Sequence, residues 1–202
     1  MSSGTRPLPL QVQLFGQQGD LIHKKLQDKS YEERKQASIK IEEAIKTSPN
    51  TADPAKVVEY LRTGFLGGGA NQKKGGLIGT AAVAIALQSD SAKQQKHLPD
   101  LVLNAVGLLQ DEDSRVRYYA CEALYNVSKS AGASILPHFQ SIFDGLIKLS
   151  ADVDMDVRSG VQVLDRLMKD IVTHNFAMFD MNEFLKLLEP RVGWINPHIR
   201  HL

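Results

Sequence analysis

Apolar residues recur along most of the chain at the spacing of one helical face. After Ser114 they fall at Val116, Ala120, Ala123, Leu124 and Val127. This is the i, i+4, i+7, i+8 pattern of an amphipathic helix. The acids just before the run are suited to accept hydrogen bonds from the free N–H groups of a first helical turn. Sustained strand-like alternation is absent from the sequence, so an all-α fold is predicted.

Three segments share an Asp that is followed six residues later by an Arg. They are LQDKSYEERKQA at 26–37, LQDEDSRVRYYA at 109–120 and SADVDMDVRSGV at 150–161. Their arginines lie 83 and 41 residues apart, and 83 is about two periods of 41. The missing member is expected near residue 75, where Lys74 supplies the basic side chain. The spacing resembles that of HEAT repeats, in which such residues ladder between neighbours. The predicted ladder consists of Asp28, Arg34, Asp111, Arg117, Asp152 and Arg158.

Another apolar-periodic stretch precedes each of these segments, which gives a unit of two antiparallel helices. A unit of about 40–47 residues is the length of a HEAT or armadillo repeat. The sequence therefore predicts an all-α, HEAT/armadillo-like solenoid of about four and a half helix pairs. After a flexible N-terminus at 1–19, the predicted repeats span 20–47, 53–89, 96–131, 134–173 and 179–202. The last repeat is incomplete, which is typical of a fragment of a longer solenoid.

Composition narrows the function classes. The chain has 202 residues and a net charge of +1, which argues against broad attraction to nucleic acid or anionic membranes. The apolar run at 77–87 is 11 residues long, well below the ~20 needed for a transmembrane helix. The single cysteine, Cys121, is expected to be a small buried residue. We expect a cytoplasmic protein that is peripheral on membranes.

The candidate catalytic and metal-binding motifs lack the residue spacing that such sites require. The glycine-rich stretch at 64–76 has no register that supplies a phosphate-binding loop. The acids at 152, 154 and 156 imitate the start of a calcium loop, but Val157 and Val163 stand where Gly and Glu are needed. No catalytic residues, cofactor or metal are therefore predicted, and the protein is not expected to be an enzyme.

Four segments carry a more specific resemblance. KKGGLIGTAAVAIAL, RVRYYACEALYN, LPHFQSIFDGLIKLSAD and VLDRLMKDIV occur in this order. Together they resemble the N-terminal part of the Vac-type vacuole-morphology scaffold family, over roughly residues 20–190. The resemblance implies a non-enzymatic HEAT-repeat scaffold for phosphatidylinositol 3,5-bisphosphate synthesis and turnover on endosomal and vacuolar membranes.

The resemblance also implies partners. It assigns binding of a FYVE-domain phosphatidylinositol 3-phosphate 5-kinase to the repeats at approximately 73–170. Self-association and binding of a Sac-family phosphoinositide phosphatase are assigned mainly to a C-terminal part of the family that is missing from this chain.

A second stripe lies opposite the apolar face of the 114–131 helix. It contains Tyr118, Glu122, Tyr125 and Lys129. The repeat spacing carries this stripe forward to Ser159, Val163, Arg166 and Asp170, and back, with Lys74 aligned to Arg117, to Gly75, Gly79, Ala82 and Ala86. The tyrosines either pack under a neighbouring element or anchor a partner, a role in which tyrosine is enriched. We predict that the stripe is a partner-binding face for the kinase.

Three other functions remain as alternatives. A general HEAT-repeat trafficking or transport adaptor with a different protein partner shares the predicted fold. A lipid- or nucleic-acid-binding module is disfavoured by the neutral net charge and the lack of a basic stripe. An enzyme is the last alternative.

Overall fold

The computed structural model describes residues 7–189, and this part of the chain contains helices and no strand. The α-helices are α1 (Leu10–Phe15), α2 (Gly19–Leu26), α3 (Tyr31–Thr47), α4 (Pro54–Leu61), α5 (Ala70–Ala86), α6 (Ser91–Val106), α7 (Ser114–Ala131), α8 (Phe139–Leu149), α9 (Met155–His174) and α10 (Met181–Leu188). Short 3-10 or π-helical segments are η1 (Gly16–Gln18), η2 (Arg62–Leu66), η3 (Gly132–His138) and η4 (Phe176–Met178).

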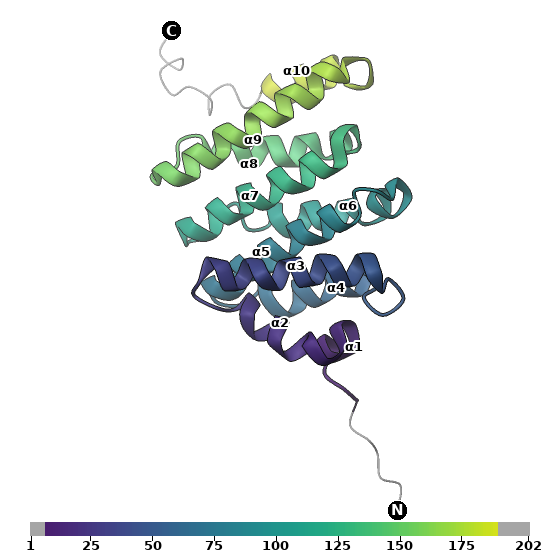
Figure 1. Ribbon diagram of the computed structural model, residues 1–202. Coiled ribbons are helices and arrows are strands. Elements are labelled where there is room, and N and C mark those ends of the chain that lie inside the picture. The colour runs from purple at the N-terminus through teal and green to yellow at the C-terminus, as the bar shows by residue number, and fades with distance from the viewer. Residues whose placement is uncertain (1–6, 190–202) are drawn as a thin grey trace, which may run out of the picture.

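Helix pairs stack along one direction from the N-terminal to the C-terminal end (Figure 1). The second helices of the pairs, α3, α5, α7 and α9, pack on one another in chain order. The first helices α2, α4, α6 and α8 each pack against the second helix of their own pair. The predicted all-α solenoid is therefore confirmed. The expected second helix of the last pair lies outside the described residues.

Side-chain caps explain where several helices begin. Aspartates at the N-caps of α4, α6, α7, α9 and α10 accept hydrogen bonds from backbone N–H groups of the first turn. They are Asp53, Asp90, Asp113, Asp154 and Asp180. Such caps satisfy N–H groups that have no partner within the helix. Asp154, which imitated a calcium ligand in the sequence, is thus a helix cap.

The apolar stripe of α7 forms part of one continuous core. Val116, Ala120, Ala123, Leu124 and Val127 are each 2% exposed or less. Four of these five positions have buried apolar counterparts one repeat later in α9: Val157, Val161, Leu164 and Met168. The periodicity therefore identified the inward faces of both helices.

The N-terminal segment differs from the flexible 1–19 expected from the sequence. Residues 10–15 form α1, which packs on α2 and α4 and buries Leu14. Gly19 permits the close approach, because a Cβ atom there would lie 2.3 Å from the Gln11 carbonyl oxygen. With 6 residues, α1 has fewer than two helical turns and is too short to show a helical period in the sequence.

The Asp-to-Arg motif shapes the loops in front of α3, α7 and α9. Asp28, Asp111 and Asp152 each accept a hydrogen bond from the backbone N–H two residues later. Arg34, Arg117 and Arg158 each donate Nη1 to the carbonyl oxygen of their own Asp and to that of the next residue. The six-residue spacing thus closes a loop within one repeat.

The same motif also links neighbouring repeats, although among the described residues Asp28 and Arg158 of the predicted ladder bond only within their own repeat. Arg117 donates Nε and Nη2 to the Asp152 carboxylate at 2.7 and 2.9 Å, and both side chains are largely buried. One repeat earlier, Lys73 binds Asp111 at 2.6 Å. The expectation that Lys74 holds the basic position was wrong by one residue. Arg34 instead reaches past α5 to the Tyr119 hydroxyl at 2.7 Å.

Candidate functional site

A groove between α7 and α9 brings together much of the predicted stripe. It has a volume of about 370 Å³. Its lining consists of Tyr118, Cys121, Glu122, Tyr125, Asn126, Ser159, Gly160 and Val163. Five of these residues were predicted from the sequence: Tyr118, Glu122, Tyr125, Ser159 and Val163. We call this site the α7/α9 groove.

Two tyrosines form the wall of the α7/α9 groove on α7. The Tyr118 ring packs edge-on against Tyr119 with 5.9 Å between centroids, and the Arg115 guanidinium lies 5.1 Å from its centre. The Tyr125 ring has the Lys129 ammonium 5.8 Å from its centre. Both rings are partly buried against the core yet still line the groove. Each tyrosine therefore combines internal packing with an open surface.

The floor of the groove depends on close contact between the two helices. A Cβ atom at Gly160 would lie 3.3 Å from the Cys121 Cβ and 3.5 Å from the Tyr118 ring. A glycine in a helix interior costs about 1 kcal/mol relative to alanine, and here it allows α9 to approach α7. Cys121 is buried, and burial raises the pKa of its thiol to about 12. A thiol held protonated in this way is unsuited to act as a nucleophile.

A second groove continues the surface across α7 to α3. We call it the α3/α7 groove, and its volume is about 280 Å³. Its lining consists of Tyr31, Lys35, Ser38, Ile39, Glu42, Leu77, Ile78, Ala81, Ala82, Ile85, Tyr119, Glu122, Ala123 and Asn126. Glu122 and Asn126 line both grooves, so the two meet over α7.

The contribution of α3 was missed, although the sequence held a signal for it. Moving Tyr118, Glu122 and Tyr125 back by the 83-residue spacing of the arginines gives positions 35, 39 and 42. These are Lys35, Ile39 and Glu42, and all of them line the α3/α7 groove.

The glycine part of the predicted stripe was wrong. Gly75 and Gly79 are buried, and Cβ atoms there would lie 1.8 Å from the Leu26 carbonyl oxygen and 2.6 Å from the Leu61 side chain. Ala82 and Ala86 are also largely covered, at 4% and 6% exposed. The cause is the register of α5. When Lys73 is aligned with Arg117, the stripe moves to Lys74, Ile78, Ala81 and Ile85, and the last three line the α3/α7 groove.

The remaining charged members of the stripe lie away from the lining. Lys129, Arg166 and Asp170 are exposed on α7 and α9 but do not line the α7/α9 groove. Arg166 and Asp170 lie farther along α9 than Val163, toward its C-terminal end. Any contact they make with a partner would therefore be at the edge of the site.

Glu122 occupies an unusual electrostatic position at the junction of the grooves. Within residues 7–189, no hydrogen bond or ion pair reaches its carboxylate, and the side chain is only partly exposed. Burial raises the pKa of this carboxyl, and the nearby Arg115 charge opposes the shift. Arg115 is itself bound to Asp156 at 2.7 Å. The junction thus holds a carboxylate without a bound cation.

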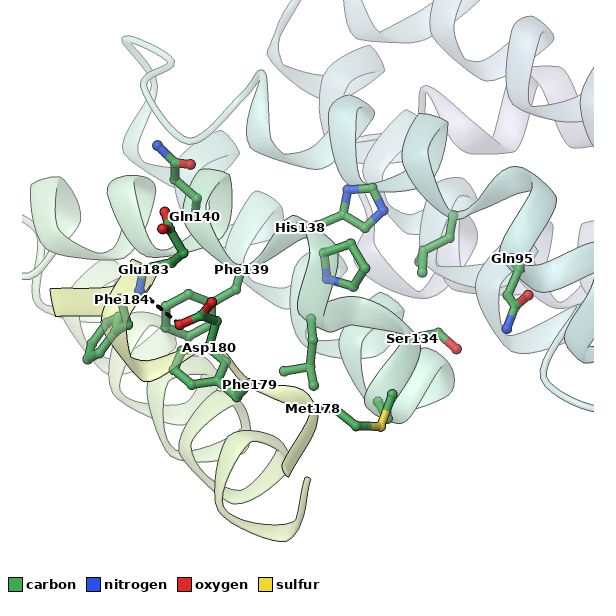
Figure 2. A pocket seen from close by; sticks show the side chains of 14 residues that line it. Gln95, Ser134, His138, Phe139, Gln140, Met178, Phe179, Asp180, Glu183 and Phe184 are labelled. Atoms are coloured by element: carbon green, nitrogen blue, oxygen red, sulfur yellow. Dashed lines mark hydrogen bonds between the residues drawn. The ribbon is translucent and has the colours of Figure 1, made fainter. Parts of the chain in front are cut away.

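A larger hollow, about 620 Å³, lies near α10 (Figure 2). Phe139, Phe179 and Phe184 pack with their ring centroids 5.0–5.5 Å apart on one side of it. Its acids are already engaged, because Asp180 caps α10 and Glu183 binds Lys186 at 2.6 Å. This hollow contains none of the predicted stripe residues and no described acid that lacks a partner.

None of the helices in the described part of the chain has the length and apolar content that crossing a membrane requires.

Comparison with known proteins finds one matching family and several similar proteins. The family described as "Vacuolar 14 Fab1-binding region" matches residues 71–170, which run from α5 to α9. The chain is 43% identical over 183 residues to a "Protein VAC14 homolog" of Arabidopsis thaliana, covering 89% of the chain and 24% of that protein. It is 37% identical over 166 residues to the Schizosaccharomyces pombe protein of the same name, covering 79% and 20%.

A third relative has a different name. The "Vacuole morphology and inheritance protein 14" of Saccharomyces cerevisiae is 39% identical over 164 residues, covering 78% of the chain and 18% of that protein. The chain therefore spans about a fifth to a quarter of the length of these relatives. No solved structure matches it.

Proposed function

The chain belongs to the Vac14 family, and from this premise we propose that it binds a Fab1-type lipid kinase through the α7/α9 groove. In this role it is a non-enzymatic scaffold, and the partner is a FYVE-domain phosphatidylinositol 3-phosphate 5-kinase. The complex supports synthesis and turnover of phosphatidylinositol 3,5-bisphosphate on endosomal and vacuolar membranes.

One observation carries the proposal. The α7/α9 groove lies within the residues matched by the Fab1-binding family, and five residues of the predicted stripe line it. Its walls offer two partly open tyrosine rings and Val163, which is 50% exposed. Tyrosine is enriched among the residues that contribute most to binding, and exposed apolar residues gathered in one patch favour contact with a partner.

Two further partnerships belong to the whole protein. We propose that longer members of the family use other parts of their chain to self-associate and to bind a Sac-family phosphatase. The present chain spans at most 24% of its compared relatives. Neither partnership is assigned to a residue of this structure.

Co-precipitation with the Fab1-type kinase tests the proposal. Tyr125→Ala removes one aromatic wall and is expected to weaken binding about thirtyfold, or about 2 kcal/mol. Val163→Arg is expected to weaken it further by placing an unpaired charge in a desolvated contact. Val153→Arg is the matched control, since Val153 is 92% exposed and lies outside the groove.

Thermal melting of the same variants separates binding from folding. Val163 is half exposed, whereas the Tyr125 ring packs partly against the core. Val163→Arg should therefore melt close to the wild-type temperature, and Tyr125→Ala only moderately below it, while both variants lose the kinase. Binding that persists in both variants would refute the groove as the site. A collapse of melting would show that these residues act through packing alone.

A further inference from the structure

The carboxylate of Glu122 projects where two grooves meet, and no described side chain neutralises it. It lines both the α3/α7 groove and the α7/α9 groove. The rings of Tyr31 and Tyr118 lie close enough for the Glu122 charge to raise the pKa of each hydroxyl, although burial is the larger cause in both. The carboxylate is therefore enclosed mainly by aromatic and apolar groups.

The charged groups around Glu122 already have other contacts. On α3, Glu42 is bound to Lys46, and the Lys35 ammonium lies 5.9 Å from the centre of the Tyr31 ring. On α7, Arg115 binds Asp156 of α9. In the described part of the chain, α5 and α9 line the grooves with uncharged residues: Leu77, Ile78, Ala81, Ala82, Ile85, Ser159, Gly160 and Val163.

A partly buried charge without a partner is costly to a folded protein. Taking an ion out of water is unfavourable unless another charge or several hydrogen bonds compensate. A glutamine of the same shape would avoid the cost of the charge. Proteins commonly retain such destabilising groups where a function uses them. Glu122 lies between two mainly apolar grooves. A ligand that matches this site would therefore carry a cation on an apolar segment.

We propose that Glu122 accepts a lysine or arginine side chain from the docked kinase segment, in which apolar residues on both sides of that cation fill the two grooves. This inference rests on the proposed function and deepens it, because it states the chemistry of the segment that binds. The α3/α7 groove thereby becomes part of the docking surface, with Ile39 and Ile85 facing one apolar side of the segment and Val163 the other.

Charge complementarity commits the site to this occupant. An acidic or phosphorylated segment would bring like charge to Glu122, and an entirely apolar one would bury the carboxylate without a partner. Like-charge contact and unpaired buried charge both oppose binding. A basic side chain removes the cost, and the tyrosine rings beside it add a favourable cation–π contribution.

Loss of the Glu122 charge is expected to raise stability and to weaken binding, a combination that a purely structural role would not produce. Glu122→Gln keeps the shape of the side chain and removes its charge. The free chain is expected to melt at a higher temperature, because the unpaired charge is gone. Binding to the kinase is expected to weaken about tenfold, because the cation of the partner loses its acceptor.

The experiment titrates the chain against the intact Fab1-type kinase at two salt concentrations, with thermal melting of each variant. Glu112→Gln is the matched control, since Glu112 is exposed outside both grooves and its loss changes net charge equally. Wild type and Glu112→Gln are expected to bind alike and to weaken with salt. Glu122→Gln is expected to bind more weakly and to respond less to salt.

Each other outcome has a distinct meaning. If Glu122→Gln binds like wild type while Tyr125→Ala loses the kinase, the groove is the site and the acceptor role is overturned. If neither variant affects binding, the α7/α9 groove is refuted as the site together with the inference. Equal losses in Glu122→Gln and Glu112→Gln would indicate a general charge effect and overturn the inference. A lower melting temperature for Glu122→Gln would also overturn it, since Glu122 would then stabilise the fold.

Discussion

Arg117 connects a loop of its own repeat to the next repeat through a single guanidinium. Nη1 donates to two carbonyl oxygens of the preceding loop, and Nε and Nη2 bind the Asp152 carboxylate. The hydrogen bond raises the pKa of Arg117, and from the other side it lowers the pKa of Asp152. A bidentate pair of this kind is stronger and more directional than an ordinary ion pair.

Arg117→Ala is therefore expected to destabilise the chain by about 3 kcal/mol, because it leaves a buried carboxylate and two carbonyl oxygens without their donor. Urea unfolding measures the change. Arg115→Ala is the control, since Arg115 and Asp156 have side chains 51% and 65% exposed. Exposed pairs contribute roughly 1 kcal/mol or less. Equal effects of the two substitutions would contradict the role given to the buried pair.

The contributions of Glu122 and Asp152 to stability are expected to depend on pH with opposite signs. Burial raises the pKa of Glu122 in the folded chain, so the folded state binds more protons than the unfolded state between the two pKa values. Stability from this group is therefore greatest at low pH and decreases as pH rises through the raised pKa. The pKa of Asp152 is lowered, so the contribution of Asp152 to the stability of the fold is lost as pH falls.

The Glu122 contribution appears as a difference between two proteins. We expect the melting temperature of wild type, relative to that of Glu122→Gln, to decrease from about pH 4 toward pH 7. The other titrating groups are common to both proteins and cancel. A constant difference across this range would show that the carboxyl is not perturbed in the fold.

At the scale of elements, periodicity predicted the second helices well, and glycine caused the main error. In α7 and α9 the apolar positions that the periodicity predicted to face inward are buried in the structure. In α5 small residues carry little periodic signal, so Lys74 was aligned where Lys73 belongs. A slip of one residue turns a helix by about 100°, which moved the predicted stripe from the open face to the buried one.

Contacts between distant segments could not be predicted from one sequence. Tyr119 follows Tyr118 directly, and spacing alone assigned it no function. Its hydroxyl accepts a hydrogen bond from an arginine 85 residues away, and its ring lies 6.4 Å from that of Tyr31. The 83-residue spacing could have indicated positions 35, 39 and 42, but the contact of Arg34 and Tyr31 with Tyr119 became visible only in three dimensions.

The register of α5 makes a direct prediction. Gly75→Ala is expected to destabilise the chain by about 3 kcal/mol, because the new Cβ would meet the Leu26 carbonyl oxygen at 1.8 Å and force α5 away from α2. In an open helix the same substitution would stabilise by about 1 kcal/mol.

Gly67→Ala is the control for that substitution, since a Cβ atom there has no neighbour within 4 Å and the backbone φ is −91°. Chemical denaturation of the two variants should differ clearly in midpoint. A Gly75→Ala variant as stable as wild type would mean that α5 does not pack on α2 as described.

Across the whole molecule, stacking makes each helix pair depend chiefly on its neighbours, and one contact departs from this rule. In solenoids, stability is approximately a sum of repeat terms and nearest-neighbour interfaces. Arg34 of α3, only 3% exposed, bonds Tyr119 of α7 across the intervening α5, and its guanidinium lies 5.3 Å from the centre of that ring. The first and third pairs are thereby joined directly, beneath the α3/α7 groove.

Removing one oxygen atom tests this connection. Tyr119→Phe keeps the ring but leaves a buried Nη2 of Arg34 without its acceptor, and we expect a loss of about 2 kcal/mol. Relative to wild type, hydrogen-exchange protection should fall more in α3 than in α9, because the lost bond joins α3 to α7 and does not involve α9. Tyr125→Phe is the control, since no described residue bonds the Tyr125 hydroxyl. Equal loss of protection in α3 and α9 would instead indicate that the array unfolds as one unit.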